Sequence, residues 1–125
     1  MFNITTVLLL HNEVLKQYGG AAGMRDAGLL DSALNRPFQT FSGEDLYPGV
    51  FEKAAAIIES VILNHPFIDG NKRTGFLLCT SFLLDYDIYL VATEDDRYNF
   101  VINISTGGLS FEEIVTWLQE NTEVK

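Results

Sequence analysis

Residues 50–86 read VFEKAAAIIESVILNHPFIDGNKRTGFLLCTSFLLDY, and this stretch predicts two helices joined by a short loop. In the first helix, Val50–Asn64, apolar side chains recur every three or four residues on a wide stripe, which favours a central position in the fold. The second helix, from near 71 to about 86, is apolar on nearly every side, so we expect it to be the core helix. Pro66 and Gly70 break the pattern between them.

Four further helices are predicted around this pair, and most of their ends carry recognisable signals. Asp26 and Thr93 are placed as N-caps, and Ser110 with Glu113 fits a capping box. Pro37 to Pro48 breaks the helical pattern and predicts a loop or irregular hairpin with exposed aromatic side chains, while residues 87–92 predict an extended connector. The sequence therefore predicts one all-α domain over residues 1–125, with about six helices, the additional ones covering residues 6–18, 27–34, 94–105 and 111–118.

The charge balance excludes several classes of function. The 125 residues hold 8 Lys and Arg against 17 Asp and Glu, a formal net charge of −9, so we expect no nucleic-acid partner and no docking on anionic membrane. The single Cys79 excludes a disulfide framework and a cysteine-built zinc site, and its apolar surroundings predict a buried side chain. The short apolar run near the N-terminus has no basic residue before it, so we expect a cytoplasmic protein without a membrane span.

The segment after the first central helix, HPFIDGNKRTG at residues 65–75, departs from local rules. Free N–H groups at the start of a helix form a ready anion site, and Gly70 lets the backbone approach a ligand closely. Lys72 and Arg73 stand in the first helical turn, where the helix dipole disfavours each cation by about 0.3–1 kcal/mol. A bound polyphosphate would reverse that penalty, so these residues indicate a phosphate site.

Two further residues of the segment complete a catalytic set. Asp69 provides one carboxylate beside the anion, which suits Mg²⁺ shared with phosphate oxygens. His65 provides an imidazole, a side chain that can act as a general base. Together these parts indicate phosphoryl or nucleotidyl transfer, although His65 could also be a local helix cap, Asp69 a plain N-cap and the two cations solvated surface charges.

The same segment resembles the motif of the Fic/Doc family, and its N-K-R ending is similar to the death-on-curing, or Doc, branch. Sequence similar to Doc toxins also surrounds the motif, so the resemblance covers nearly the whole chain. The resemblance implies a compact Fic/Doc-like bundle in which the irregular segment 37–48 is the flap that aligns the target chain. The supporting stretches are LLDSALNRP at 29–37, EDLYP at 44–48 and FEKAAA at 51–56.

The resemblance also implies an activity. Doc-type toxins transfer the γ-phosphate of ATP to a Ser or Thr hydroxyl of elongation factor Tu, which arrests translation, and a separate antitoxin neutralises them. By resemblance, His65 would be the general base and Asp69 would hold Mg²⁺. Gly70 and Asn71 would cradle phosphate at the helix start. Lys72 and Arg73 would neutralise the charge of the phosphates and bind the nucleotide.

Departures from the family pattern bear on the chemistry. Adenylylating Fic proteins, which transfer AMP, usually have glycine where Lys72 stands and a second arginine where Phe76 stands, so both residues favour the kinase. Leu63 takes a place where some Doc toxins carry a basic residue. The alternatives are a Fic-type adenylyltransferase and a non-catalytic module that binds nucleotide or a partner protein.

Three remaining features have simpler interpretations. His11 lies on the first predicted helix without a matching partner, so we expect a surface or capping role. Trp117 indicates core or an edge anchor. Residues 116–121, TWLQEN, resemble the S/T-x-x-x-E-G/N string by which some Fic proteins block their own ATP site, but ordinary helix core is the favoured interpretation.

Overall fold

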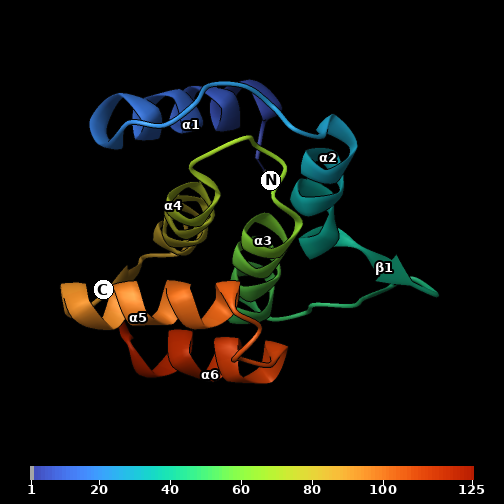
Figure 1. The fold of residues 1–125 in the computed structure, drawn as a ribbon. Coiled ribbons are helices and arrows are strands. Elements are labelled where there is room, and N and C mark those ends of the chain that lie inside the picture. The colour runs from blue at the N-terminus through green and yellow to red at the C-terminus, as the bar shows by residue number, and fades with distance from the viewer. Residues whose placement is uncertain (1) are drawn as a thin grey trace.

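The computed structural model describes residues 2–125 and confirms a mostly helical fold with six α-helices (Figure 1). Four short strands and one 3-10 helix, η1, complete the described part of the chain. The helices are α1 Ile4–Tyr18, α2 Ala27–Asn35, α3 Val50–Asn64, α4 Asn71–Leu84, α5 Glu94–Ser105 and α6 Phe111–Glu120, with η1 at Arg36–Phe38. The strands are β1 Thr40–Phe41, β2 Glu44–Asp45, β3 Ile88–Leu90 and β4 Thr122–Val124.

Helix α3 forms the centre of the bundle. It contacts α2, α4, α5, α6 and η1, and Figure 1 shows it in the middle of the fold with α4 beside it. The side chains of residues 54–58 are fully buried, and the three alanines among them allow neighbouring helices to approach closely. Helix α4 contributes buried side chains to the core but keeps Lys72, Arg73 and Leu84 exposed, so the expectation of a helix buried on nearly every side was wrong. Its cations at the motif end prevent complete burial.

Capping hydrogen bonds confirm the predicted starts of three helices. The Asp26 carboxylate accepts a hydrogen bond from Leu29 N–H at 3.0 Å, and the Thr93 hydroxyl accepts one from Asp96 N–H at 3.1 Å. Ser110 forms both halves of its capping box with Glu113. Each cap satisfies N–H groups that have no partner inside the helix.

The flap, residues 37–48, is a short antiparallel hairpin of β1 and β2 that projects from the body of the fold (Figure 1). Phe41 at its end is 74% exposed. The base of the flap is fixed by Arg36, which pairs with Glu59 at 2.8 Å and donates to the Tyr47 hydroxyl at 2.9 Å. Burial opposes the charge of Arg36, but the bonds to Tyr47 and Glu59 outweigh it, so its pKa is raised.

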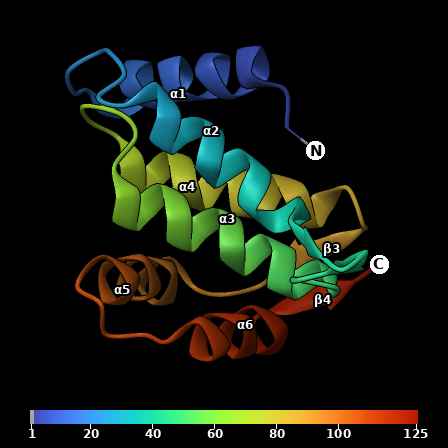
Figure 2. The ribbon, with the colours of Figure 1, turned by 90° about the vertical axis from the view of Figure 1, so that its right-hand side faces the viewer.

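The C-terminal segment forms a pairing that the sequence did not predict. The expected extended connector contains β3, which pairs antiparallel with β4 at the far end of α4 from the motif (Figure 2). Cys79 is buried as predicted, and Trp117 stacks on Phe100 with 3.7 Å between the ring centroids. No helix in residues 2–125 has the length and apolarity needed to cross a membrane.

Candidate functional site

All six predicted site residues lie around one cavity at the start of α4. We call this space, about 270 Å³ in volume, the motif cavity. Its walls come from the last residue before the α3–α4 loop, the loop itself and the first turn of α4, so the chain reversal between the two helices gathers them. The lining residues are His65, Ile68, Asp69, Gly70, Asn71, Lys72 and Arg73.

His65 ends α3 in a left-handed backbone conformation, with φ 49° and ψ 59°. This region disfavours residues with a Cβ atom, so a histidine here indicates local strain. The side chain is exposed and faces the cavity. Its backbone carbonyl accepts a hydrogen bond from Arg25 Nε at 2.6 Å, and a second guanidinium nitrogen of Arg25 donates to the carbonyl of Asn64. The surrounding chain thereby holds the strained turn.

Asp69 is fixed by the loop that joins α1 to α2. One carboxylate oxygen accepts from its neighbour Gly70 N–H at 2.9 Å, and the other accepts from Ala21 N–H at 3.2 Å. A Cβ atom at Gly20 would lie only 2.8 Å from the Asp69 carboxylate, and φ at Gly20 is +121°. The chain therefore needs glycine at position 20 to pass this close to the acid.

The start of α4 presents its backbone to the cavity. The first rung of the helix ladder is Thr74 N–H to Gly70 O at 2.9 Å, so the N–H groups of residues 71–73 precede it. Gly70 caps the helix at φ +78°, a conformation suited to glycine. The Asn71 side-chain oxygen accepts from Phe67 N–H and its side-chain nitrogen donates to the Phe67 carbonyl, so this amide closes the loop.

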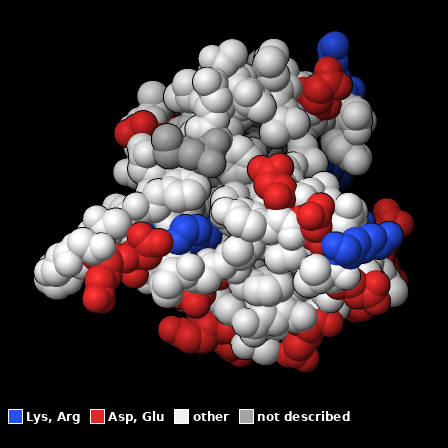
Figure 3. Space-filling model, turned by 180° about the vertical axis from the view of Figure 1, so that it is seen from behind, with Lys and Arg blue, Asp and Glu red and all other residues white. Residues whose placement is uncertain are grey.

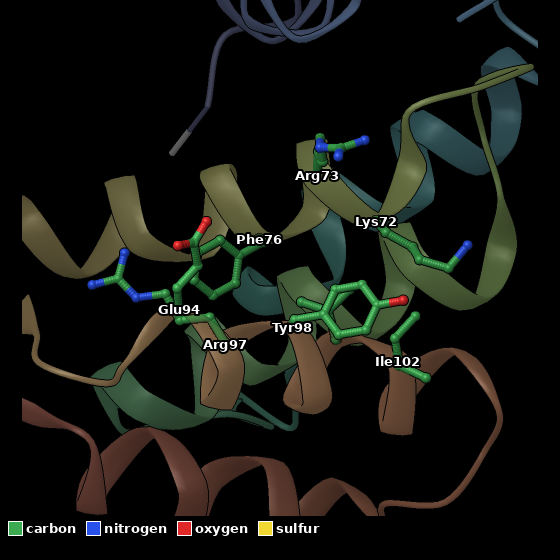
Figure 4. A pocket seen from close by; sticks show the side chains of 8 residues that line it. Lys72, Arg73, Phe76, Glu94, Arg97, Tyr98 and Ile102 are labelled. Atoms are coloured by element: carbon green, nitrogen blue, oxygen red, sulfur yellow. The ribbon is translucent and has the colours of Figure 1, made fainter. Parts of the chain in front are cut away.

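The two cations of the motif extend from the same turn in different directions. Figure 4 shows Lys72 and Arg73 leaving opposite sides of α4. The Arg73 guanidinium lies over the Tyr18 ring, 4.1 Å from its centroid. The face in Figure 3 carries many acidic side chains and few basic ones, so a pair of neighbouring exposed cations stands out in this chain.

His11 is a residue whose role the sequence did not indicate. It is buried, 3% exposed, and its ring stacks on Phe67 with 3.8 Å between centroids. Its Nε2 lies 2.8 Å from the Asp69 carbonyl oxygen and must donate there, because a carbonyl only accepts. The expected surface or capping role was wrong, because α1 turns His11 inward onto the loop that carries the acid.

The loop from Gly19 to Asp26 braces the motif through its backbone. The N–H groups of Arg25 and Asp26 both donate to the Pro66 carbonyl, and Ile68 N–H donates to Gly23 O at 3.1 Å. The loop contains three glycines, at positions 19, 20 and 23, and this glycine content is the sequence signal that its backbone passes close to the motif. Leu63, in the last turn of α3, is exposed, and the Arg25 guanidinium binds the backbone carbonyls of the two residues that follow it.

Comparison with known proteins agrees with this geometry. A family model described as the Fic/DOC family matches residues 1–83, which include α1, the bracing loop, the flap and the whole motif. The chain belongs to the Fic/DOC family. It is 42% identical over 87 residues to "Toxin Doc" of Mycolicibacterium smegmatis, covering 69% of this chain and 67% of that protein. It is 25% identical over 113 residues to "Protein kinase doc" of Escherichia phage P1, covering 90% and 88%.

The donor set of this Fic/DOC site fits a Mg²⁺ ion held jointly with a ligand. Asp69 is the one carboxylate among the residues that line the motif cavity, and the described chain has no cluster of three or more acidic, histidine or cysteine ligands. Mg²⁺ is commonly bound through one or two carboxylates together with substrate phosphates and water. A single acid beside the open start of α4 matches that pattern.

The string at residues 116–121 lies away from the Fic/DOC motif. It ends α6 beside the β3–β4 pair, where Val91 N–H donates to the Asn121 carbonyl, at the opposite end of α4 (Figure 2). The 14 residues of α4 span about 20 Å. None of residues 116–121 lines the motif cavity, so this structure supports the interpretation as ordinary helix.

Proposed function

We propose that this Fic/DOC chain is a Doc-type toxin kinase that transfers the γ-phosphate of ATP to a Ser or Thr hydroxyl of a translation factor. The observation that carries the proposal is the motif cavity, in which an exposed histidine, a carboxylate, a helix start and two cations line one space. The resemblance to Doc toxins supports elongation factor Tu as the target. Phosphorylation of this factor would arrest translation.

Six of the residues that line the motif cavity have a role in the proposed transfer. The His65 imidazole accepts the proton of the target hydroxyl. That oxygen then forms a bond to the γ-phosphorus while the bond from the γ-phosphorus to the bridging oxygen breaks, and ADP leaves. Lys72 and Arg73 offset charge on the phosphates, and the backbone of Gly70 and Asn71 positions them. Mg²⁺ held by Asp69 would add further positive charge at the phosphates.

The flap supplies a place for the target chain. β1 and β2 are each two residues long and exposed, so an extended target segment could add along one edge by backbone hydrogen bonds. The anchor at Arg36 and Glu59 holds the flap at its base, which would position the target hydroxyl without closing the cavity.

A neutralising antitoxin is the second partner that we propose. The relative named "Toxin Doc" supports a toxin–antitoxin pair. The net charge of −9 favours an antitoxin that docks through a basic segment, and such a complex should weaken as salt increases. Affinity for the antitoxin that did not change with salt would count against this part of the proposal.

A labelling experiment tests the reaction. The protein is incubated with elongation factor Tu, Mg²⁺ and ATP labelled at either the γ- or the α-phosphate. We expect label on the target from the γ position alone, and label from the α position would identify an adenylyltransferase instead. Growth arrest should also disappear in His65→Ala and Asp69→Ala; arrest that persisted in both folded variants would indicate a non-catalytic module.

A further inference from the structure

Arg25 contacts the peptide groups on both sides of His65. Its Nε donates to the His65 carbonyl at 2.6 Å, and a second guanidinium nitrogen donates to the Asn64 carbonyl. Arg25 lies in the loop between α1 and α2, which Figure 2 shows at the same end of the bundle as the α3–α4 loop. The last turn of α3 has no basic residue of its own, so a residue 40 positions away provides the cation that the helix dipole favours there.

The two carbonyls that Arg25 binds belong to the two peptide groups that flank the Cα atom of His65. The Asn64 carbonyl lies in the peptide group before that atom, and the His65 carbonyl lies in the one after it. Because each peptide group is planar, fixing the direction of both planes fixes φ and ψ between them. The guanidinium presents its donors in a rigid fork, so it holds the two carbonyls in one relative orientation. Arg25 thereby sets the direction in which the His65 side chain leaves the backbone.

The turn at His65 needs such an external constraint. Its φ of 49° and ψ of 59° are left-handed, a region that disfavours residues with a Cβ atom. The next residue is Pro66, and a residue that precedes proline favours extended backbone. Proline also has no N–H, so it cannot donate back to the last carbonyls of α3 as a residue after a helix often does. Without Arg25 we expect the turn to relax toward extended backbone, which would move the imidazole.

The backbone around Arg25 fixes the position of this side chain. The N–H groups of Arg25 and Asp26 donate to the Pro66 carbonyl at 2.8 and 3.0 Å, so the loop binds three successive carbonyls, those of residues 64–66. The chain has 17 acidic residues and only 8 Lys and Arg, yet none of the ion pairs among residues 2–125 includes Arg25. A scarce cation is therefore bound to the His65 turn and not to a carboxylate.

The proposed Mg²⁺ ligand has separate supports. The Asp69 carboxylate accepts from the N–H groups of Ala21 and Gly70. Its backbone carbonyl accepts from His11. None of these bonds involves the side chain of Arg25. A change of that side chain should therefore displace the imidazole of the motif and leave its carboxylate in place.

We propose that Arg25 is a positioning residue for the proposed general base, because its hold on both neighbouring peptide groups directs the His65 imidazole into the motif cavity. This proposal rests on the proposed function and deepens it, since it makes the rate of the transfer step depend on a residue outside the motif. Arg25 does not line the motif cavity, so it acts through His65. A lysine at this position would keep the charge but lose the fixed orientation of the fork.

Steady-state kinetics test this role through separate effects on kcat and KM. We expect Arg25→Ala to lower kcat roughly tenfold or more, because a displaced base slows the transfer step. The KM for ATP and the Mg²⁺ concentration for half-maximal activity should stay at their wild-type values. Arg25→Lys should recover only part of kcat, and it provides the same comparison if Arg25→Ala does not fold.

Nuclear magnetic resonance of the His65 backbone tests the geometry without relying on catalysis. The coupling between its amide and α protons and its ¹³Cα shift both depend on φ and ψ. In Arg25→Ala both should move from left-handed toward extended values. Thr93→Ala is the control for a general loss of stability, because it removes the N-cap of α5, a helix that does not line the motif cavity. It should lower Tm and keep the wild-type kcat and His65 signals.

The outcomes separate the positioning role from the proposed function. A folded Arg25→Ala protein that keeps the wild-type kcat or the left-handed His65 signals would overturn the role, as would a wild-type kcat in Arg25→Lys. A raised KM for ATP with unchanged kcat would overturn it in favour of a contact with the nucleotide. If only the kinase function is wrong, the His65 signals still change in Arg25→Ala although the wild type transfers no γ-phosphate. If only the positioning role is wrong, Arg25→Ala transfers γ-phosphate at the wild-type rate.

Discussion

Replacement of His65 should separate stability from activity, because its left-handed backbone is strained. At φ 49° a side chain with a Cβ atom costs about 1–2 kcal/mol relative to the right-handed region, and glycine avoids this cost. The greater freedom of glycine in the unfolded chain lowers the free energy of unfolding by about 0.5–1 kcal/mol, which offsets part of this gain. The exposed imidazole loses little packing. We therefore expect His65→Gly to raise the free energy of unfolding by about 0.5–1 kcal/mol while abolishing phosphate transfer.

Urea unfolding followed by circular dichroism would measure the difference between His65→Gly and His65→Ala, with activity recorded for both. Alanine keeps the strain and removes the imidazole, so it should be inactive and close to the wild type in stability. Asp87→Gly is a matched control, because Asp87 also has a positive φ, 59°, but lies at the other end of α4. It should gain stability and keep its activity. A His65→Gly protein less stable than His65→Ala would refute the reasoning.

Three further predictions concern His11, Gly20 and Cys79. His11→Leu keeps much of the packing but loses the bond to the Asp69 carbonyl, so kcat/KM should fall by roughly tenfold or more. His11→Gln retains a donor and should recover part of the lost kcat/KM. Equal losses of kcat/KM in the two variants, measured in steady-state assays, would contradict a positioning role. Gly20→Ala should raise the Mg²⁺ concentration needed for half-maximal activity through its clash with Asp69, whereas Gly19→Ala, which meets no atom within 4 Å, should not. Burial raises the pKa of the Cys79 thiol to about 12, so the folded protein keeps a proton that the unfolded chain loses above about pH 9. Between these pKa values the unfolding free energy should fall by up to about 1.4 kcal/mol per pH unit from this group, and pH-dependent urea unfolding of Cys79→Ala should lack that contribution.

Local signals in the sequence predicted the helices well. Caps such as Asp26 and Ser110 act within four residues, so their partners are visible in the sequence itself. The central place of α3 followed from its wide apolar stripe, but the partial exposure of α4 was less accessible. Both α3 and α4 are strongly apolar, and only packing shows that the alanines of α3 admit neighbours on several sides while Lys72 and Arg73 keep one end of α4 open.

The residues of the candidate site also fall into those that the sequence could predict and those that it could not. The motif residues are contiguous in the chain, so one loop and one helix turn bring them together and the sequence could name them all. The supports come from 40 or more residues away: Arg25 binds the carbonyl of His65, and His11 binds that of Asp69. A hydrogen bond from a side chain to a distant backbone group produces no recognisable pattern of residue types in the sequence. The glycines at 19–23 were the sequence feature that indicated a close approach of this loop to the motif.

Intact-mass analysis of the target most directly tests the central claim, that the motif cavity transfers the γ-phosphate. Elongation factor Tu would be incubated with Mg-ATP and either the wild-type protein or His65→Ala, and its mass measured. The account predicts the gain of a single phosphoryl group with the wild type and no change with His65→Ala. The gain of an adenylyl group, or a phosphoryl gain that persists with His65→Ala, would contradict it.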